Sequence, residues 1–362
     1  MDTRVQFVTP EQPLWRTVLA ATAHDVYHLP EYARLAEWTD GGEAGAFVYR
    51  DGAATVLWPV VVRALPAGLT RREALRDATG VYGYGSPASS PTATAEDLTA
   101  ALTHIGEAAR QMGIVSIFSR LHPLLSFEPA RLPAGCAIAF EGVTAGIDLW
   151  RDEAALWSAL RHNHRRNVRR LQREGFQTVW NVWRRLPDFV RLYRDTMERV
   201  GASGYYRFPE GYFHQLAREL GSHTRFGLVV DPQGAAVAGG LFFVRRGIVQ
   251  YHLGATARSH LKVSPAKLLF WDAARRAAAT GDRVLHLGGG NGREADSLLR
   301  FKKGFATDEY TFRTLRFVTS PPAYRALCER SGIVADRSAT PLPNTDGFFP
   351  DYRVAPPEQV TA

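Results

Sequence analysis

The stretch LHLGGGNGREADSLLRFKKGFATDEYTF, residues 285–312, is the most informative part of this chain. A short apolar run at 284–287 leads into three glycines, and an amphipathic segment follows at 296–301. Glycine lets the backbone approach a ligand closely, because it has no Cβ and tolerates positive φ. Lys302 and Lys303 follow and could meet a negative charge held there. On these residues alone, a strand–loop–helix connection with solvated lysines is the simpler interpretation.

Part of this stretch follows the pattern D–x–L–x–x–F–K–x–x–F, carried by Asp296, Leu298, Phe301, Lys302 and Phe305. The pattern resembles the C-terminal signature of the Fem-type aminoacyltransferases and their GNAT-like relatives. Enzymes of that family move an amino acid from an aminoacyl-tRNA to an amine, most often on a peptidoglycan precursor. The resemblance covers most of the chain, from about Tyr27 to Phe317. It implies an α+β fold made of tandem GNAT-like domains with mainly antiparallel central sheets.

The order of predicted elements agrees with a duplicated fold. Two apolar runs within 44–64 flank the Asp51-Gly52 pair, which is a strong hairpin signal, and a helix at 95–112 and a strand at 114–120 follow. A second series repeats this plan: a helix at 152–173 that stops at Gly175, a strand at 176–182, helices at 187–200 and 209–220, antiparallel strands within 225–256, a helix at 264–280 and a strand at 284–287. We therefore predict domains at 1–145 and 146–320, followed by a Pro-rich tail at 321–362 whose last stretch is poorly ordered.

Composition and charge limit the class of protein. The chain has 362 residues, a formal net charge of +8 and a pI of about 9.6. A positive surplus favours a polyanionic partner such as nucleic acid, a phosphorylated substrate or an anionic membrane. No apolar run is long enough to span a bilayer, and the N-terminus lacks the features of a secretion signal. With only Cys136 and Cys328 present, we expect a cytoplasmic protein without a disulfide framework. Neither a CxxC nor an HExxH spacing occurs, so no zinc site is expected.

The densest positive charge lies in the segment RHNHRRNVRRLQR, residues 161–173. Spacings of three and four residues place several arginines on one face of the predicted helix, one turn after His162. The functional interpretation is contact with a phosphate backbone, and the alternative is a solvated basic face. Fem-type relatives carry a similar basic helix, where domain packing or an anionic substrate is a further alternative. The predicted tRNA contacts are Arg165, Arg166, Arg169, Arg170, Arg173 and Lys303.

Three further groups are candidates for binding or catalysis. Tyr82 and Tyr84, in YGYGSP, lie in a loop that by resemblance faces the acceptor, although a tight turn is the simpler interpretation. His252, next to Tyr251 at a strand end, is a candidate general base, although a structural histidine is the more ordinary reading. An aromatic-basic cluster at 205–208 has three alternative interpretations: it lines an acceptor pocket, it stacks on a base, or it packs a loop onto the core. The predicted substrate-binding residues are Tyr82, Tyr84, Tyr206, Arg207, Tyr251, Gly289, Asn291 and Asp296.

The donor is the main question that the sequence leaves open. GNAT acetyltransferases hold the pyrophosphate of acetyl-CoA on a (Q/R)-x-x-G-x-(G/A) loop at a helix N-terminus. Here the corresponding residues, 258–262, contain no glycine, although Ser264 is a plausible N-cap and Pro265 suits the first turn. This departure favours a donor other than CoA. An acyl-CoA-dependent N-acyltransferase and a non-catalytic RNA-binding protein remain alternatives.

The resemblance implies aminoacyl-tRNA as co-substrate and no cofactor, because the aminoacyl ester is already activated. Transfer passes through a tetrahedral oxyanion, which positioning and a positive group stabilise. By resemblance Lys302, beside Phe301, is the candidate for that group, with Lys303 as the alternative. The chain is shorter than most Fem enzymes and lacks the coiled-coil arm of some. The acceptor is therefore open between a peptidoglycan precursor and a small antibiotic-like amine.

Overall fold

The computed structural model describes residues 4–69, 75–290, 296–333 and 343–354. The chain forms two compact units, unit 1 with residues 1–141 and 312–362, and unit 2 with residues 142–311. These boundaries differ from the predicted 145/146 and 320/321. The difference arises because part of strand β13 (Asp308–Val318) pairs with β6 (Ile114–Arg120), so the chain returns to unit 1 after residue 311.

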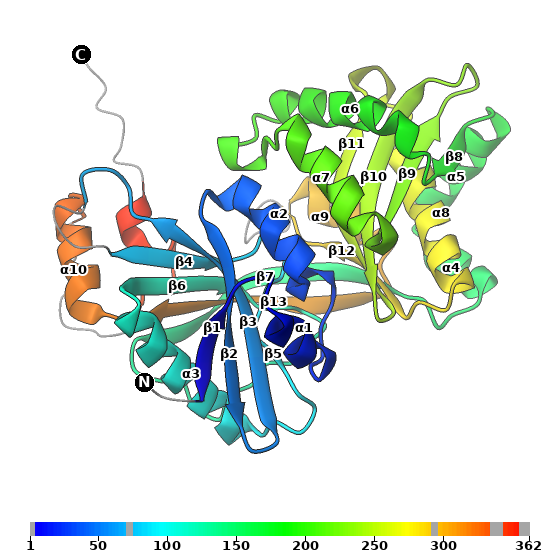
Figure 1. Ribbon diagram of the computed structural model, residues 1–362. Helices are drawn as coiled ribbons and strands as arrows, with labels where there is room; N and C mark the ends of the chain where they lie inside the picture. Colours follow the sequence, from blue (N-terminus) through cyan, green and yellow to red (C-terminus); the bar gives the residue numbers. More distant parts are fainter. Residues whose placement is uncertain (1–3, 70–74, 291–295, 334–342, 355–362) are drawn as a thin grey trace, which may run out of the picture. The chain divides into compact units, whose positions relative to one another are not determined.

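Unit 1 is built on a mainly antiparallel sheet (Figure 1). Its neighbouring strands are β1 (Val5–Val8), β2 (Glu43–Asp51), β3 (Ala54–Ala64), β4 (Arg76–Gly80), β6 and β13, and the short β5 (Ala88–Ser89) pairs with β3. The predicted hairpin at 44–64 is confirmed, with Asp51 opposite Ala54. The central residues of β2 and most residues of β3 are buried because helices cover both strands. These helices are α1 (Pro13–Ala20), α2 (Pro30–Asp40) and α3 (Ala95–Gln111).

Unit 2 is also built on mainly antiparallel strands. Its neighbouring strands are β7 (Cys136–Asp148, whose last seven residues belong to this unit), β12 (Val284–Gly288), β11 (Ile248–Thr256), β10 (Ala236–Arg245), β9 (Thr224–Val230) and β8 (Gln177–Trp180). Helix α8 (Ala266–Ala279) packs on these strands, and α5 (His162–Arg173) packs against α8. Helix α6 (Leu186–Arg199) packs on β10 and β11, and α7 (Glu210–Leu220) packs against α6 (Figure 1). Phe242 contacts Phe270 of α8, whereas its neighbour Phe243 contacts His252, so β10 is packed on both faces.

Both units contain the same strand–helix–strand crossover. In unit 1, β4 and β6 are parallel and are joined through α3. In unit 2, β11 and β12 are parallel and are joined through α8. Each is the parallel pair of an otherwise antiparallel sheet. The predicted repetition of hairpin, helix and strand is therefore present in space, without a repeat in the letters.

The strand that follows each crossover pairs with a strand of the other unit. β7 follows β6 in the sequence, but its residues 145–148 pair with β12 of unit 2. β13 follows β12, but its residues 314–318 pair with β6 of unit 1. Each sheet is thus completed by a strand from the other half of the sequence, an arrangement that local patterns cannot reveal.

Two further predictions need correction. The single helix expected at 152–173 is two helices, α4 (Glu153–Ala159) and α5, because Leu160 is extended with ψ 139° and buries its side chain. The Arg161 N–H then donates to the Gly304 carbonyl at 2.9 Å instead of continuing α4. The predicted tail contains α10 (Pro321–Arg330) and a 3₁₀ turn at Asp351–Arg353, which bury Leu327 and Tyr352. Its last stretch, 355–362, lies outside the described residues.

Candidate functional site

The glycine-rich segment forms a compact local structure at the end of β12. Asp296 is the N-cap of α9 (Ser297–Lys302), and its carboxylate accepts a hydrogen bond from the Leu299 N–H at 2.7 Å. Gly290 lies so close that a Cβ there would be 2.5 Å from Asp296 Oδ1. A larger residue at position 290 would therefore displace the cap. Asn291, a predicted substrate contact, lies outside the described residues.

Lys302 is enclosed at the end of α9. Its side chain is 7% exposed, and Nζ donates to the Gly289 carbonyl at 2.6 Å. Nζ also lies 5.7 Å from the centre of the Tyr251 ring, within cation–π range. Burial lowers the pKa of Lys302 to about 8, against the attraction of Asp296, which raises it. The group thus remains mostly an ammonium at neutral pH, with one of its three N–H donors used by Gly289.

Phe301 is part of the core beside Lys302. Its ring lies 5.7 Å from Phe270, 5.5 Å from Phe305 and 5.5 Å from His164. The His164 Nε2 contacts the Phe301 carbonyl at 3.2 Å, and burial lowers the pKa of His164 to about 4. These contacts connect α5 to α9. The position of Phe301 suits a residue that holds α9, and with it Lys302, in place.

His252 is not brought together with Lys302. Its ring is 8% exposed, stacks 4.2 Å from Phe243 and lies with Nε2 2.8 Å from the Tyr212 hydroxyl. Adjacent Tyr251 contacts Lys302, so His252 points to the opposite face of the sheet. Burial lowers the pKa of His252 to about 3, which makes it a weak base at neutral pH. Its role as general base stays a prediction that these contacts do not favour.

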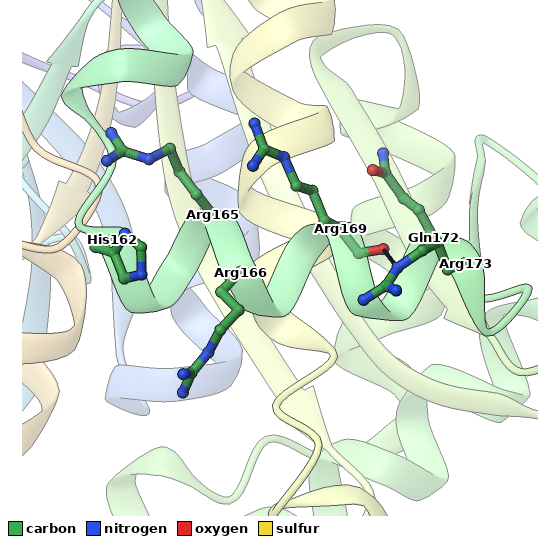
Figure 2. Close-up of a pocket in the computed structure, with 6 residues that line it drawn as sticks. All are labelled: His162, Arg165, Arg166, Arg169, Gln172 and Arg173. Carbon is green, nitrogen blue, oxygen red and sulfur yellow. Dashed lines mark hydrogen bonds between the residues drawn. The ribbon is translucent and has the colours of Figure 1, made fainter.

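Helix α5 presents its arginines on the face opposite its buried residues, His164, Val168 and Leu171. The exposed face borders an open depression of about 610 Å³. Figure 2 shows the six side chains that line it, from successive turns of the helix: His162, Arg165, Arg166, Arg169, Gln172 and Arg173. Within the described part of the chain, no carboxylate forms an ion pair with any of these arginines. A dense positive surface without internal neutralisation attracts a polyanion.

Two of the predicted tRNA contacts are placed differently. Arg170 lies on the flank of α5, where Nη2 donates to the Val263 carbonyl at 3.3 Å and Nε lies 3.8 Å from Glu174. Arg170 does not line the depression beside α5, and its tRNA contact stays a prediction. Lys303 forms an ion pair with Glu309 at 2.9 Å. The continuous cationic face consists of the other four arginines with His162.

The segment before α8 is folded on itself. Residues Arg258–His260 form a 3₁₀ turn, and Ser264 has φ 51°. The predicted N-cap role of Ser264 is wrong, because Pro265 occupies that position and the Ser264 hydroxyl donates to the Leu261 carbonyl at 3.2 Å. Several backbone N–H groups donate to carbonyls of the same segment: those of His260, Leu261, Val263, Ser264, Lys267 and Leu268. These groups are thus not presented to a pyrophosphate, as an acetyl-CoA cradle requires.

Tyr82 and Tyr84 lie in unit 1 in a well-anchored loop. The Tyr82 carbonyl accepts from the Tyr32 hydroxyl at 2.7 Å, and the Arg120 guanidinium lies 5.9 Å from the Tyr82 ring. The half-buried Tyr84 ring packs edge-on against three others, those of Tyr27, His122 and Phe312. Burial raises the pKa of Tyr84 well above its usual value. The loop is therefore ordered by aromatic packing, whatever ligand it meets.

A buried polar network beside Tyr84 escaped the sequence reasoning. The Asp25 carboxylate accepts from His122 Nε2 at 2.8 Å and contacts His28 Nδ1 at 3.1 Å. His122 Nδ1 accepts from the Leu124 N–H at 3.0 Å, so its Nε2 carries the hydrogen. Burial alone would raise the pKa of Asp25, but His122 and His28 hold it well below its usual range. Asp25 and His28 lie at the two ends of a short 3₁₀ turn, Val26–His28. Nothing in the sequence pairs them with His122.

Tyr206 is the last residue of a 3₁₀ turn at Gly204–Tyr206 in unit 2, and Arg207 follows it. Tyr206 is 38% exposed, and its carbonyl accepts from the Tyr193 hydroxyl at 2.8 Å. Arg207 Nε donates to the Ala202 carbonyl at 3.1 Å. The Tyr206 ring also meets that of Tyr205 edge-on, and the binding role of Tyr206 stays a prediction. Sequence reasoning also missed Trp157, which adjoins the arginine face.

Comparisons with known proteins agree with this geometry. Residues 158–303, all within unit 2, match the family described as Acetyltransferase (GNAT) domain. No curated protein matches the sequence. The structure of FemX is similar with a TM-score of 0.65 and 14% identity, over 89% of this chain and 98% of that chain.

Two other structures are similar at lower scores. L-PGS from Bacillus licheniformis has a TM-score of 0.51 and 12% identity, over 91% of this chain and 99% of that chain. The C-terminal domain of a putative lysylphosphatidylglycerol synthetase from Agrobacterium fabrum has a TM-score of 0.50 and 14% identity, over 88% and 95%. The predicted tandem GNAT-like fold is confirmed, and the resemblance to Fem-type proteins is confirmed at the level of the fold. None of the described helices is long and apolar enough to cross a membrane.

Proposed function

We propose that this protein is an aminoacyltransferase that moves an amino acid from an aminoacyl-tRNA to an amine, forming an amide bond. The cationic face of α5 carries this proposal. It presents four arginines without a described acidic partner on a helix that packs against the lysine-bearing segment. A CoA thioester has one small cluster of phosphates, whereas a tRNA backbone offers a row of phosphates that a helix face can follow.

The buried lysine supplies the chemistry. The acceptor amine attacks the ester carbonyl carbon, a tetrahedral oxyanion forms, and the bond to the tRNA ribose oxygen then breaks. The amine loses a proton and the departing ribose oxygen gains one. Lys302 is an ammonium at neutral pH in a water-poor setting, where a donor aimed at developing negative charge is most effective. Gly289, Asp296 and Tyr251 hold this ammonium in position. No metal or cofactor is needed, because the ester is already activated.

The closed segment before α8 supports tRNA over CoA. Several of its backbone N–H groups are occupied, and residues 258–262 contain no glycine that would let a pyrophosphate approach. The second candidate, an acyl-CoA-dependent N-acyltransferase, is favoured by the match of 158–303 to the GNAT domain family. The acceptor in the first case is a peptidoglycan precursor or a small natural-product amine.

The test is a transfer assay with two donors. The protein is incubated with total tRNA charged with labelled amino acids, and separately with labelled acetyl-CoA. Each reaction contains a peptidoglycan pentapeptide precursor or a mixture of small primary amines. We expect an amide product from the tRNA reaction, lost after RNase treatment, and none from acetyl-CoA. An RNase-insensitive product from acetyl-CoA would replace this function with the second candidate.

A further inference from the structure

A second depression of about 610 Å³ adjoins the arginine face of α5. Helices α4, α5 and α8 enclose it, and its lining includes Glu153, Trp157, Arg169, Gln172, Trp271 and Arg275. Arg169 and Gln172 line both depressions, so the two are adjacent. We refer to this second depression as the tryptophan hollow.

The tryptophan hollow is lined by two tryptophan rings and the guanidinium groups that contact them. The Arg169 guanidinium lies 5.1 Å from the centre of the Trp157 ring. Trp157 meets Trp271 edge-on at 4.8 Å, and the Arg275 guanidinium lies 5.9 Å from Trp271. Cation–π contact holds each planar guanidinium against a ring, so less side-chain freedom is lost when a ligand binds.

Polar groups at the edge of the hollow complete the lining. Gln172 is exposed and offers both an amide donor and an amide acceptor. The Glu153 carboxylate accepts from Arg275 Nε at 2.8 Å and retains further acceptor capacity. Planar surfaces for stacking, edge donors and acceptors, and an adjoining row of arginines are the three features that an unpaired nucleotide requires.

We propose that the tryptophan hollow binds an unpaired nucleotide of the tRNA whose backbone lies along α5, an inference that rests on the proposed function. A base that enters the hollow can stack on the Arg169 guanidinium, because bases stack on guanidinium planes as well as on aromatic rings. The neighbouring phosphates meet the cationic face. An anionic membrane would also be attracted to the arginines, but it presents no flat ring to this hollow.

The test replaces the stacking plane while keeping the charge. Arg169→Lys retains the positive charge at an exposed position but removes the planar guanidinium. Arg276→Lys is the matched control, since Arg276 is also exposed and lies 5.4 Å from the Trp180 ring, outside the hollow. Binding is measured by fluorescence anisotropy with deacylated tRNA, with a blunt RNA duplex of equal phosphate number, and with phosphatidylglycerol vesicles.

We expect Arg169→Lys to weaken tRNA binding about fivefold or more and to leave duplex binding unchanged. Arg276→Lys should change neither. Trp157→Ala should reproduce the selective loss, provided that its melting temperature shows a folded protein. Equal effects of Arg169→Lys on tRNA and duplex, or no effect on either, would overturn the nucleotide site while tRNA-dependent transfer still stands. Wild-type protein that binds vesicles but not tRNA would overturn both the site and the proposed function.

Discussion

Lys302→Met should separate the catalytic role of this lysine from its cost to folding. Methionine is unbranched, flexible and apolar, so it fills the space of the lysine side chain without the charge. If the ammonium faces the oxyanion, turnover should fall by about 10²–10³-fold, as when one oxyanion donor is removed elsewhere. The affinity for the charged tRNA should change much less, because this contact is made mainly in the transition state.

The same substitution should not destabilise the protein. Burial lowers the pKa of Lys302 from 10.5 to about 8. Since one pKa unit corresponds to about 1.4 kcal/mol, the buried charge costs the folded state about 3 kcal/mol at neutral pH. The variant loses the hydrogen bond to Gly289, worth about 1.5–3 kcal/mol for a charged donor. We therefore expect a free energy of unfolding between unchanged and about 1.5 kcal/mol higher at pH 7.

The free energy of unfolding should depend on pH differently in wild-type protein and in Lys302→Met. The pKa of Lys302 is lower in the folded state than in the unfolded state, so the unfolded state binds more protons between about pH 8 and 10.5. Wild-type stability should therefore gain a contribution from Lys302 as pH rises through this window, and the variant should lack it. Urea unfolding of both proteins at pH 7 and pH 10 measures the difference. Titratable groups common to both proteins cancel in this comparison.

Lys303→Met is the matched control, because Lys303 is paired with Glu309 at 2.9 Å and is not enclosed like Lys302. It should alter turnover only mildly. Lys302→Arg should restore activity only in part, since a planar guanidinium cannot take the place of an ammonium. If folded Lys302→Met retained near-wild-type turnover, the assignment of the oxyanion contact to Lys302 would be refuted.

Three further perturbations test other parts of the structure. Arg166→Ala should weaken tRNA binding and reduce the slope of log affinity against log salt by about 0.7–0.9, measured by salt titration; an unchanged slope would remove Arg166 from the phosphate contacts. Asp25→Ala should lower the free energy of unfolding by about 1–3 kcal/mol in urea at pH 7, since it leaves the buried His122 Nε2–H without its acceptor; an unchanged free energy of unfolding would contradict the network. Asp296→Ala should lower the free energy of unfolding by about 1 kcal/mol through loss of the N-cap. It should also shift the alkaline limb of the pH–rate profile to lower pH, because Asp296 raises the pKa of Lys302. An unshifted alkaline limb would show that Lys302 does not govern it.

Local patterns predicted most of the elements but not their assembly. The Asp51-Gly52 turn and the strand Ile114–Arg120 follow from residue spacing alone, and the structure confirms both. The break at Leu160 could not be predicted, because a buried contact and a hydrogen bond from Arg161 to a distant carbonyl cause it. Serine is a favoured N-cap residue, yet Ser264 has a positive φ and the N-cap position is occupied by Pro265.

The residues of the candidate site likewise divide into those that local sequence patterns predict and those that only the fold brings together. Lys302, Asp296 and Gly289 lie within one short stretch, so a family pattern could find them together. Tyr251 reaches Lys302 only through the fold. The sequence reasoning placed Tyr251 at a strand end, but β11 continues to Thr256. The tryptophan hollow joins Trp157 and Trp271, which are remote in sequence. Trp271 and Arg275, one turn apart on a predicted helix, were the available signal.

The exchange of β7 and β13 constrains how this protein is made. During synthesis, β6 leaves the ribosome long before residues 314–318, which complete its hydrogen bonding. Until then β6 has an open edge able to recruit a strand from another chain. Unit 2 is encoded by the uninterrupted stretch 142–311, so it can form first, while unit 1 waits for the return of the chain. A gene cut after residue 148 would yield two fragments, each lacking its closing strand, and we expect neither to accumulate as a soluble protein.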